Sequence, residues 1–268
     1  MLRRASEITG FTIGASDGPI GAVTDLLFDD SVWLVRWFVV DTGRIVPGRK
    51  VLLPPLVLGH INHIGDQLSV RLTKQQVIDS PKTDFDEPVS RHMESNLYDY
   101  YGWTPYWSTG FYMGGYGYAG SMIAPPLQLG SIRRQREHTQ DQPSPGDPHL
   151  RSVHEVSGYR IHARDGEIGH VVDFLIEDAD WSVHYLVVDT KNWWPGKKAL
   201  ISPASIQNID WSAELVNLDV DRKLVESSPV YDEKTMVDRA YESGFHAHYR
   251  GAVVGQESYA TGRLVRSR

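Results

Sequence analysis

Two aspartates, Asp25 and Asp173, are the residues whose type and setting come nearest to acid–base chemistry. Each lies between apolar neighbours in a segment typical of a β-strand, so its carboxylate is expected to be buried. A buried carboxylate is costly unless it accepts hydrogen bonds or faces a base. No second acid, base or nucleophile recurs at a fixed spacing from either aspartate, as general acid–base catalysis would require. The sequence therefore favours a structural role for both.

Histidines offer the other possible chemistry. His60 and His63 form one close pair, and His246 and His248 form another. Zinc sites take three or four protein ligands, and no third ligand stands at a fixed spacing from either pair. The chain has no cysteine, which excludes thiolate nucleophiles, disulfides, zinc ribbons and iron–sulfur clusters. We therefore predict no catalytic residue, no metal site and no cofactor.

Aromatic residues are the candidates for partner binding. Trp193 and Trp194 precede a Pro-Gly turn, and Tyr106 and Trp107 lie in an aromatic, glycine-rich tract over residues 98–118. Aromatic side chains dominate binding hot spots, and exposed apolar groups often mark interfaces. The tryptophan pair could instead pack over one end of a β-barrel or against the other domain, and the tract could be a linker without fixed structure. Both alternatives stay open for these four candidate partner-binding residues.

The positions of these residues follow from an internal repeat. Residues 10–29 match residues 158–177 without a gap, at an offset of 148. Both copies contain Asp-Gly between β-favouring segments, which predicts a hairpin with a two-residue type I′ turn. The structural residues of this motif are Asp17, Gly18, Gly21, Asp25, Asp165, Gly166, Gly169 and Asp173.

Short strands separated by turns continue on both sides of each hairpin, at spacings of about 8 to 12 residues. An open sheet of this size would expose its edges, so closure is favoured. We predict an all-β fold of two small β-barrels related by duplication, with a short helix after each. The predicted domains are a first barrel over 1–82, a flexible linker with helical and aromatic segments over 83–150, a second barrel over 151–230, and a short helix with a basic tail over 231–268.

Comparison of the two copies also predicts the buried face of the third strand. Side chains alternate between the two faces of a strand, so positions that keep their character should point to the core. These positions are Trp33 and Trp181, Val35 and Val183, Trp37 and Tyr185, and Val39 and Val187.

Charge and hydropathy narrow the classes of partner. The chain has 34 acidic and 27 basic residues, a net charge of −7, which argues against non-specific nucleic-acid binding. It has no run of 18 apolar residues, so no transmembrane segment is predicted. The first residues lack the apolar region of a secretory signal. We therefore expect a soluble, cytoplasmic protein.

The repeated motif resembles the PRC-barrel family, here in tandem. Its pattern is Asp-Gly-x-Ile-Gly-x-Val-x-Asp, then an acidic turn, a strand ending in Val-Val-Asp, and Gly-x-Lys-x-Leu-x-x-Pro. The family's small barrel occurs in the cytoplasmic part of the photosynthetic reaction-centre H subunit and in the C-terminal domain of ribosome-maturation factors. The matching residues are Asp17, Gly18, Ile20, Gly21, Val23, Asp25, Val39, Val40, Asp41, Gly48, Lys50, Leu52 and Pro55, and, in the second copy, Asp165, Gly166, Ile168, Gly169, Val171, Asp173, Val187, Val188, Asp189, Gly196, Lys198, Leu200 and Pro203.

The resemblance implies a non-enzymatic module that binds proteins, RNA–protein assemblies or a membrane complex. The expected function is a bacterial protein-interaction or scaffolding module, associated with a membrane or photosynthetic-type complex. The alternative is an RNA- or ribosome-associated assembly factor, which would need a basic barrel face. The expected partners are proteins. The two barrels could pack on each other or exchange with a second chain to form a homodimer.

Overall fold

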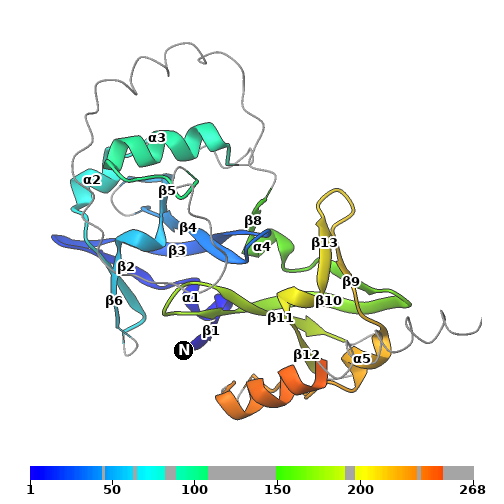
Figure 1. Ribbon diagram of the computed structural model, residues 1–268. Coiled ribbons are helices and arrows are strands. Elements are labelled where there is room, and N and C mark those ends of the chain that lie inside the picture. Colours follow the sequence, from blue (N-terminus) through cyan, green and yellow to red (C-terminus); the bar gives the residue numbers. More distant parts are fainter. Residues whose placement is uncertain are drawn as a thin grey trace, which may run out of the picture.

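The computed structural model describes residues 1–43, 46–62, 65–81, 89–107, 149–190, 197–233 and 237–249 (Figure 1). Within these residues the protein is mostly β, with two mixed seven-stranded sheets and a few short helices. The predicted β-rich fold is confirmed at this level. Trp193 and Trp194 lie outside the described residues.

The first half of the chain forms one sheet with the strand order β5-β4-β3-β2-β7-β6. Strands β2 and β7 are parallel, and the other neighbours along this order are antiparallel. Its elements are β2 (Thr12–Ala15), β3 (Gly18–Asp29), β4 (Leu34–Asp41), β5 (Lys50–Leu53), η1 (Pro55–Val57), β6 (Leu58–Asn62), β7 (Gln67–Val70), α2 (Lys74–Ile78) and α3 (Arg91–Tyr101).

The second half forms a sheet with the equivalent order, β12-β11-β10-β9-β14-β13. Here too one neighbouring pair, β14 and β9, is parallel. Its elements are β9 (Arg160–Ala163), β10 (Gly166–Glu177), β11 (Val183–Asp189), β12 (Lys198–Ile201), η2 (Pro203–Ser205), β13 (Ile206–Asp210), β14 (Leu215–Leu218), α5 (Arg222–Glu226) and a helix over 239–249.

Neither sheet closes within the described residues, whereas the sequence led us to expect closed barrels. The strand orders are open paths that end at β5 and β6 in the first sheet and at β12 and β13 in the second. Helices cover the outer sides of the sheets. In Figure 1, α3 lies against the first sheet on one side of the molecule, and helix 239–249 lies against the second sheet on the opposite side.

The first residues of each half lie on the opposite half. Strand β1 (Leu2–Arg4) pairs with β10 and is followed by α1 (Ala5–Ile8). Strand β8 (Leu150–Ser152) pairs with β3 and is followed by α4 (Val153–Val156). Each sheet thus obtains its seventh strand from the other half. We call 1–8 and 149–156 the lead-in segments.

The two halves share one hydrophobic core. The rings of Phe28 and Phe174 approach to 5.4 Å between centroids, and Phe38 and Trp181 approach to 4.7 Å. Such aromatic pairs add to the free energy gained by burying the rings. The halves therefore pack on each other within the one chain. Other buried members of this core are Ile13, Val35, Ile161, Val183 and Leu186.

Backbone hydrogen bonds also join the halves, at the turn after each long strand. The amide of Val35 donates to the carbonyl of Trp181 (2.9 Å), and the amide of Val183 donates to the carbonyl of Trp33 (2.8 Å). Trp33 and Trp181 have φ angles of 56° and 64°. A bulky residue rarely adopts this left-handed conformation, so both tryptophans carry backbone strain at the place where the halves meet.

The prediction for the third strand was only partly right, because β4 is buried on both faces. Phe38 and Val40 point into the shared core, whereas Trp37 and Val39 point to the outer side beneath α3. A strand buried on both faces loses the alternation of polar and apolar residues that sequence reading relies on. The same division holds in β11, where Leu186 and Val188 face the shared core and Tyr185 and Val187 face outward.

The hairpin turns are shifted by one residue from the predicted position. Ala15 pairs with Gly18 and Ala163 pairs with Gly166, so each Asp is the second turn residue and each Gly is the first residue of the next strand. The glycines have φ angles of 127° and 143°. The Asp-Gly pair still marks each hairpin, because glycine adopts this conformation at little cost.

The second glycine of the motif, Gly21 in the first copy and Gly169 in the second, lies where two strands pack closely. A Cβ atom on Gly21 would lie 1.9 Å from the carbonyl oxygen of Asp41, and one on Gly169 would lie 2.0 Å from that of Asp189. We predict that Gly21→Ala lowers the free energy of unfolding by about 2 kcal/mol or more, because the backbone of β4 must move. Chemical denaturation measures the change.

Gly244→Ala is the control for that substitution. It lies within helix 239–249 and has no atom within 4 Å of the added Cβ. We expect it to leave stability unchanged or to raise it by up to about 1 kcal/mol, since alanine is the better helix former. Equal effects of the two substitutions would contradict the close approach of the strands.

Candidate functional site

The motif aspartates Asp25 and Asp173 hold the lead-in segment of the opposite half. Asp173 accepts hydrogen bonds from the amide and the hydroxyl of Ser6. Asp25 accepts from the hydroxyl of Ser152 (2.5 Å) and from the amide of His154 (3.0 Å). These carboxylates thus satisfy amides at the start of α1 and α4, which have no partner inside a helix.

The turn aspartates Asp17 and Asp165 do the same for a later helix. Asp17 accepts from the amide of Lys74 at the start of α2 (2.8 Å), and Asp165 accepts from the amide of Arg222 at the start of α5 (2.7 Å). All four motif aspartates therefore have backbone amides as partners.

Asp25 and Asp29 lie in the same strand, yet their pKa values move in opposite directions. Burial raises the pKa of Asp25 and outweighs the hydrogen bonds from Ser152, His154 and Leu26. Burial also raises the pKa of Asp29, but hydrogen bonds from Ser31 and Arg36 outweigh it, and the net pKa lies below the usual range. The hydrogen bond from the Ser31 hydroxyl, followed by the hydrogen bond and the charge of the Arg36 guanidinium, lowers the pKa of Asp29.

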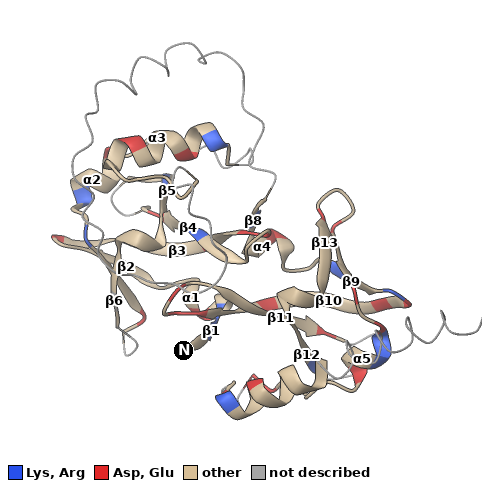
Figure 2. Ribbon diagram, viewed as in Figure 1, with Lys and Arg blue, Asp and Glu red and all other residues tan. Residues whose placement is uncertain are grey.

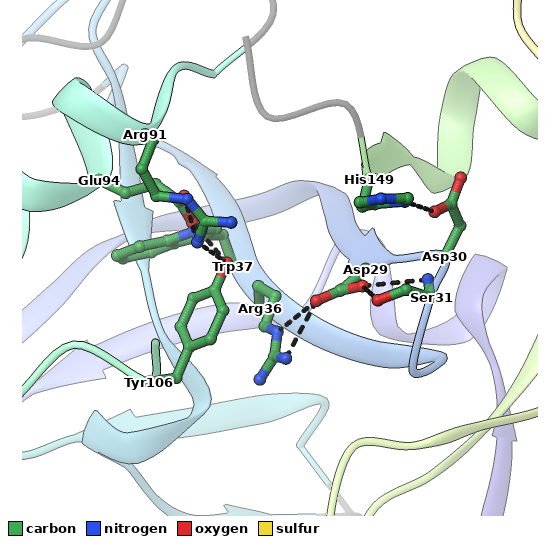
Figure 3. Close-up of polar contacts among 9 residues, drawn as sticks. All are labelled: Asp29, Asp30, Ser31, Arg36, Trp37, Arg91, Glu94, Tyr106 and His149. Carbon is green, nitrogen blue, oxygen red and sulfur yellow. Dashed lines mark hydrogen bonds and ion pairs between the residues drawn. The ribbon is translucent and has the colours of Figure 1, made fainter. Parts of the chain in front are cut away.

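The aromatic tract contributes to a polar cluster on the outer side of the first sheet, shown in Figure 3. The indole N–H of Trp37 donates to Oε1 of Glu94 on α3 (2.7 Å), and Glu94 is fully buried. Arg91 lies 3.5 Å from the same carboxylate and donates to the hydroxyl of Tyr106 (2.7 Å). A buried carboxylate needs such partners.

Arg36 links this cluster to the turn after β3. Its guanidinium pairs with Asp29 (3.0 Å) and is largely buried, and the ring of Tyr106 stacks over it at 3.8 Å. Trp107 stacks over Arg91 at 4.5 Å and contacts the ring of Tyr98. The structure therefore brings Tyr106 and Trp107 together on the first sheet, whereas residues 108–118 of the aromatic tract lie outside the described residues.

The second half has a related contact in the equivalent place. Tyr185 replaces Trp37, and Glu242 of helix 239–249 lies close enough for its charge to act on the tyrosine hydroxyl. Burial, followed by the charge of Glu242, raises the pKa of Tyr185. Both outer faces are thus covered by a helix that places a glutamate near an aromatic residue of the sheet.

The described histidines of the close pairs have other contacts. Nε2 of His246 lies 3.5 Å from the hydroxyl of Tyr185, and Nε2 of His248 lies 2.9 Å from the carbonyl of Leu224. The side chain of His60 and all of His63 lie outside the described part. Among the described residues, no three histidines or carboxylates are grouped to hold a metal ion.

A pocket of about 430 Å³ lies where the turn after β3, strand β8 and strand β13 meet. The carboxylate of Asp30 accepts from Nε of Arg151 (2.8 Å) and contacts Nδ1 of His149 (2.8 Å). Sequence reading missed this site because its members are more than a hundred residues apart. The other lining residues are Ser31, Trp33, Ile206, Gln207, Asn208 and Ile209.

No family model matches the chain, and no curated protein matches it. The resemblance to the PRC-barrel family therefore stays a prediction from the motif residues.

The opposite pKa shifts of Asp25 and Asp29 predict opposite pH effects on stability. The folded state holds a proton on Asp25 more readily than the unfolded chain does. Stability from this group is thus lost as the pH rises from the ordinary aspartate pKa through the raised folded one. For Asp29, stability is present above the ordinary pKa and is lost as the pH falls through the lowered one.

We therefore expect two variants to differ in sign. The free energy of unfolding of wild type minus that of Asp25→Asn should fall as the pH rises from 3 to 7, about the range of aspartate titration. The same difference for Asp29→Asn should rise. Urea denaturation at several pH values measures both, and parallel curves would contradict the assigned environments.

The Trp37–Glu94 contact predicts a large effect of a small change. Trp37→Phe removes the indole donor from a buried carboxylate and should lower the free energy of unfolding by roughly 2–4 kcal/mol. Trp103→Phe, on the same covered face but only partly buried, is the matched control and should cost less. Equal losses in denaturation experiments would show that ring volume, not the hydrogen bond, matters.

Proposed function

We propose that this protein is a non-enzymatic protein-interaction or scaffolding module, built as a tandem of PRC-barrel-like units. One observation carries the proposal: the four motif aspartates accept backbone hydrogen bonds that hold distant segments together, and they include Asp25 and Asp173, the two candidates for acid–base chemistry. Groups committed in this way support a rigid body, and recognition by the surface of such a body is the function it suits best.

The tandem character has support from equivalent contacts in the two halves. Arg151 pairs with Asp30, and at the same offset Arg3 pairs with Asp178. The strand orders match, and the crossed lead-in segments match.

A protein partner is favoured over nucleic acid on charge. Arg160 and His162 share the exposed face of β9, and Arg164 lies in the turn that follows, so these residues form a basic row that an RNA-associated role could use. However, Arg164 pairs with Asp219, and Glu167 lies opposite His162. Figure 2 shows basic and acidic positions interspersed along the ribbon. Nucleic-acid binding relies on a dense positive surface.

We further propose that the protein acts in the cytoplasm and binds a membrane-associated complex. No helix in the described part of the chain is long and apolar enough to cross a bilayer. Attachment to such a complex would then depend on a protein partner.

A pull-down of the tagged full-length chain from its own cells tests the proposal. Soluble and membrane fractions are analysed separately, with and without nuclease. We expect a protein partner that survives nuclease treatment. Loss of all bound material on nuclease treatment would replace the proposal with the RNA-associated role, and recovery of the chain alone would contradict it.

A further inference from the structure

The pocket beside β13 borders the free edge of a sheet. Strand β13 is the last in its sheet and pairs only with β14 among the described strands. Side chains of a strand alternate between its faces, yet four consecutive residues, 206–209, all line the pocket. The pocket therefore lies along the edge of β13, where backbone donors and acceptors are exposed.

The protection of this edge against strand addition is confined to its two ends. A register shift lies at the start, between Ile206 and Asn208, and the charged residue of β13, Asp210, lies at the end, where its carboxylate accepts from the hydroxyl of Ser212 and the amide of Ala213. From Asn208 to Asp210 the pairing with β14 is regular. Natural sheets protect edges with bulges, charged residues or covering segments, so an edge open to a pocket is a place where an extended peptide can add a strand.

The wall opposite β13 supplies a positioned cation. Nε of Arg151 is held by Asp30, and its guanidinium stacks over the ring of Trp211 at 5.0 Å. Its side chain is only 15% exposed, so the orientation is restricted. Both oxygens of Asp30 have partners, Nδ1 of His149 and Nε of Arg151. The outer guanidinium nitrogens suit a carboxylate, which arginine binds with two parallel hydrogen bonds.

We propose that this pocket binds an extended peptide segment that carries acidic side chains, added as a strand to β13, with a carboxylate of the peptide on Arg151. The inference rests on the proposed function as a protein-interaction module and names its site and the chemistry of its partner. A strand of five residues such as β13 sets the length of the bound segment at about five residues, or roughly 17 Å.

The other junction between the halves provides a matched control. Arg3 bonds through Nε to Asp178 (3.2 Å) as Arg151 does to Asp30, and the two arginine side chains are similarly buried. Replacing either arginine by methionine removes the same kind of ion pair between the halves. Any loss of stability should thus be similar, whereas only Arg151→Met should affect peptide binding.

The test uses the full-length chain and three fluorescein-labelled pentapeptides, with fluorescence anisotropy as the readout. The peptides are Val-Glu-Val-Glu-Val, its backbone N-methylated form, and Val-Lys-Val-Lys-Val. We expect the acidic peptide to bind wild type and Arg3→Met equally, and Arg151→Met about tenfold more weakly, since each 1.4 kcal/mol changes Kd tenfold. N-methylation, which blocks backbone hydrogen bonding, and the lysine peptide should both abolish binding.

A photo-crosslinker on the acidic peptide then locates the site by mass spectrometry, and we expect adducts on residues 206–209. Adducts elsewhere, equal binding of the acidic and lysine peptides, or equal weakening by both arginine variants would overturn the inference. If both arginine variants unfold, the N-methylated peptide on wild type still decides, because unchanged binding excludes strand addition.

The failure of this inference can be told apart from failure of the proposed function. If the pull-down recovers a nuclease-resistant partner equally well with wild type and Arg151→Met, the interaction role stands and this pocket is not its site. If the acidic peptide binds at 206–209 but no partner is recovered from cells, the pocket stands and the scaffolding role fails.

Discussion

The crossed hydrogen bonds from Asp25 and Asp173 are the interaction on which the rest of the structure depends. Each carboxylate lies in the long strand of one half and accepts from an amide in the first helix of the other half. The donor is 129 residues from Asp25 and 167 residues from Asp173 along the chain. A capping hydrogen bond of this kind contributes about 1 kcal/mol. Its greater effect is geometric, because it places β1 on β10 and β8 on β3, and so supplies each sheet with a strand that its own half lacks.

The same crossing explains why Trp33 and Trp181 are held in a left-handed conformation. That conformation costs roughly 1–3 kcal/mol for a non-glycine residue. It directs the carbonyl of each tryptophan to a valine amide of the opposite half, and it allows the rings to pack on Phe28 and Phe38. Backbone hydrogen bonds and ring burial at the contact between the two halves therefore offset this strain.

Sequence reasoning could locate the hairpins, the β-rich class and the amide partners of buried aspartates, because these depend on signals within a few residues. It could not identify which segment supplies the amides to Asp25, because the donor on His154 is remote in sequence. The face of Trp37 was also assigned wrongly. Both faces of β4 are buried, one by the other half and one by α3, so hydrophobicity no longer distinguishes them.

The two halves share one backbone arrangement but differ in side chains at equivalent positions. We expect the residues that recognise a partner to be among these differences. Trp37 donates to Glu94 and Tyr185 lies near Glu242, each on a covering helix, so this difference is accommodated within the protein. Arg3 and Arg151 both pair with an aspartate across the contact between the halves, but Arg151 also stacks on Trp211 and lines a pocket beside an open strand edge. Arg151 therefore has two roles: it stabilises the contact between the halves, as Arg3 does, and it also lines a cavity that can bind a partner.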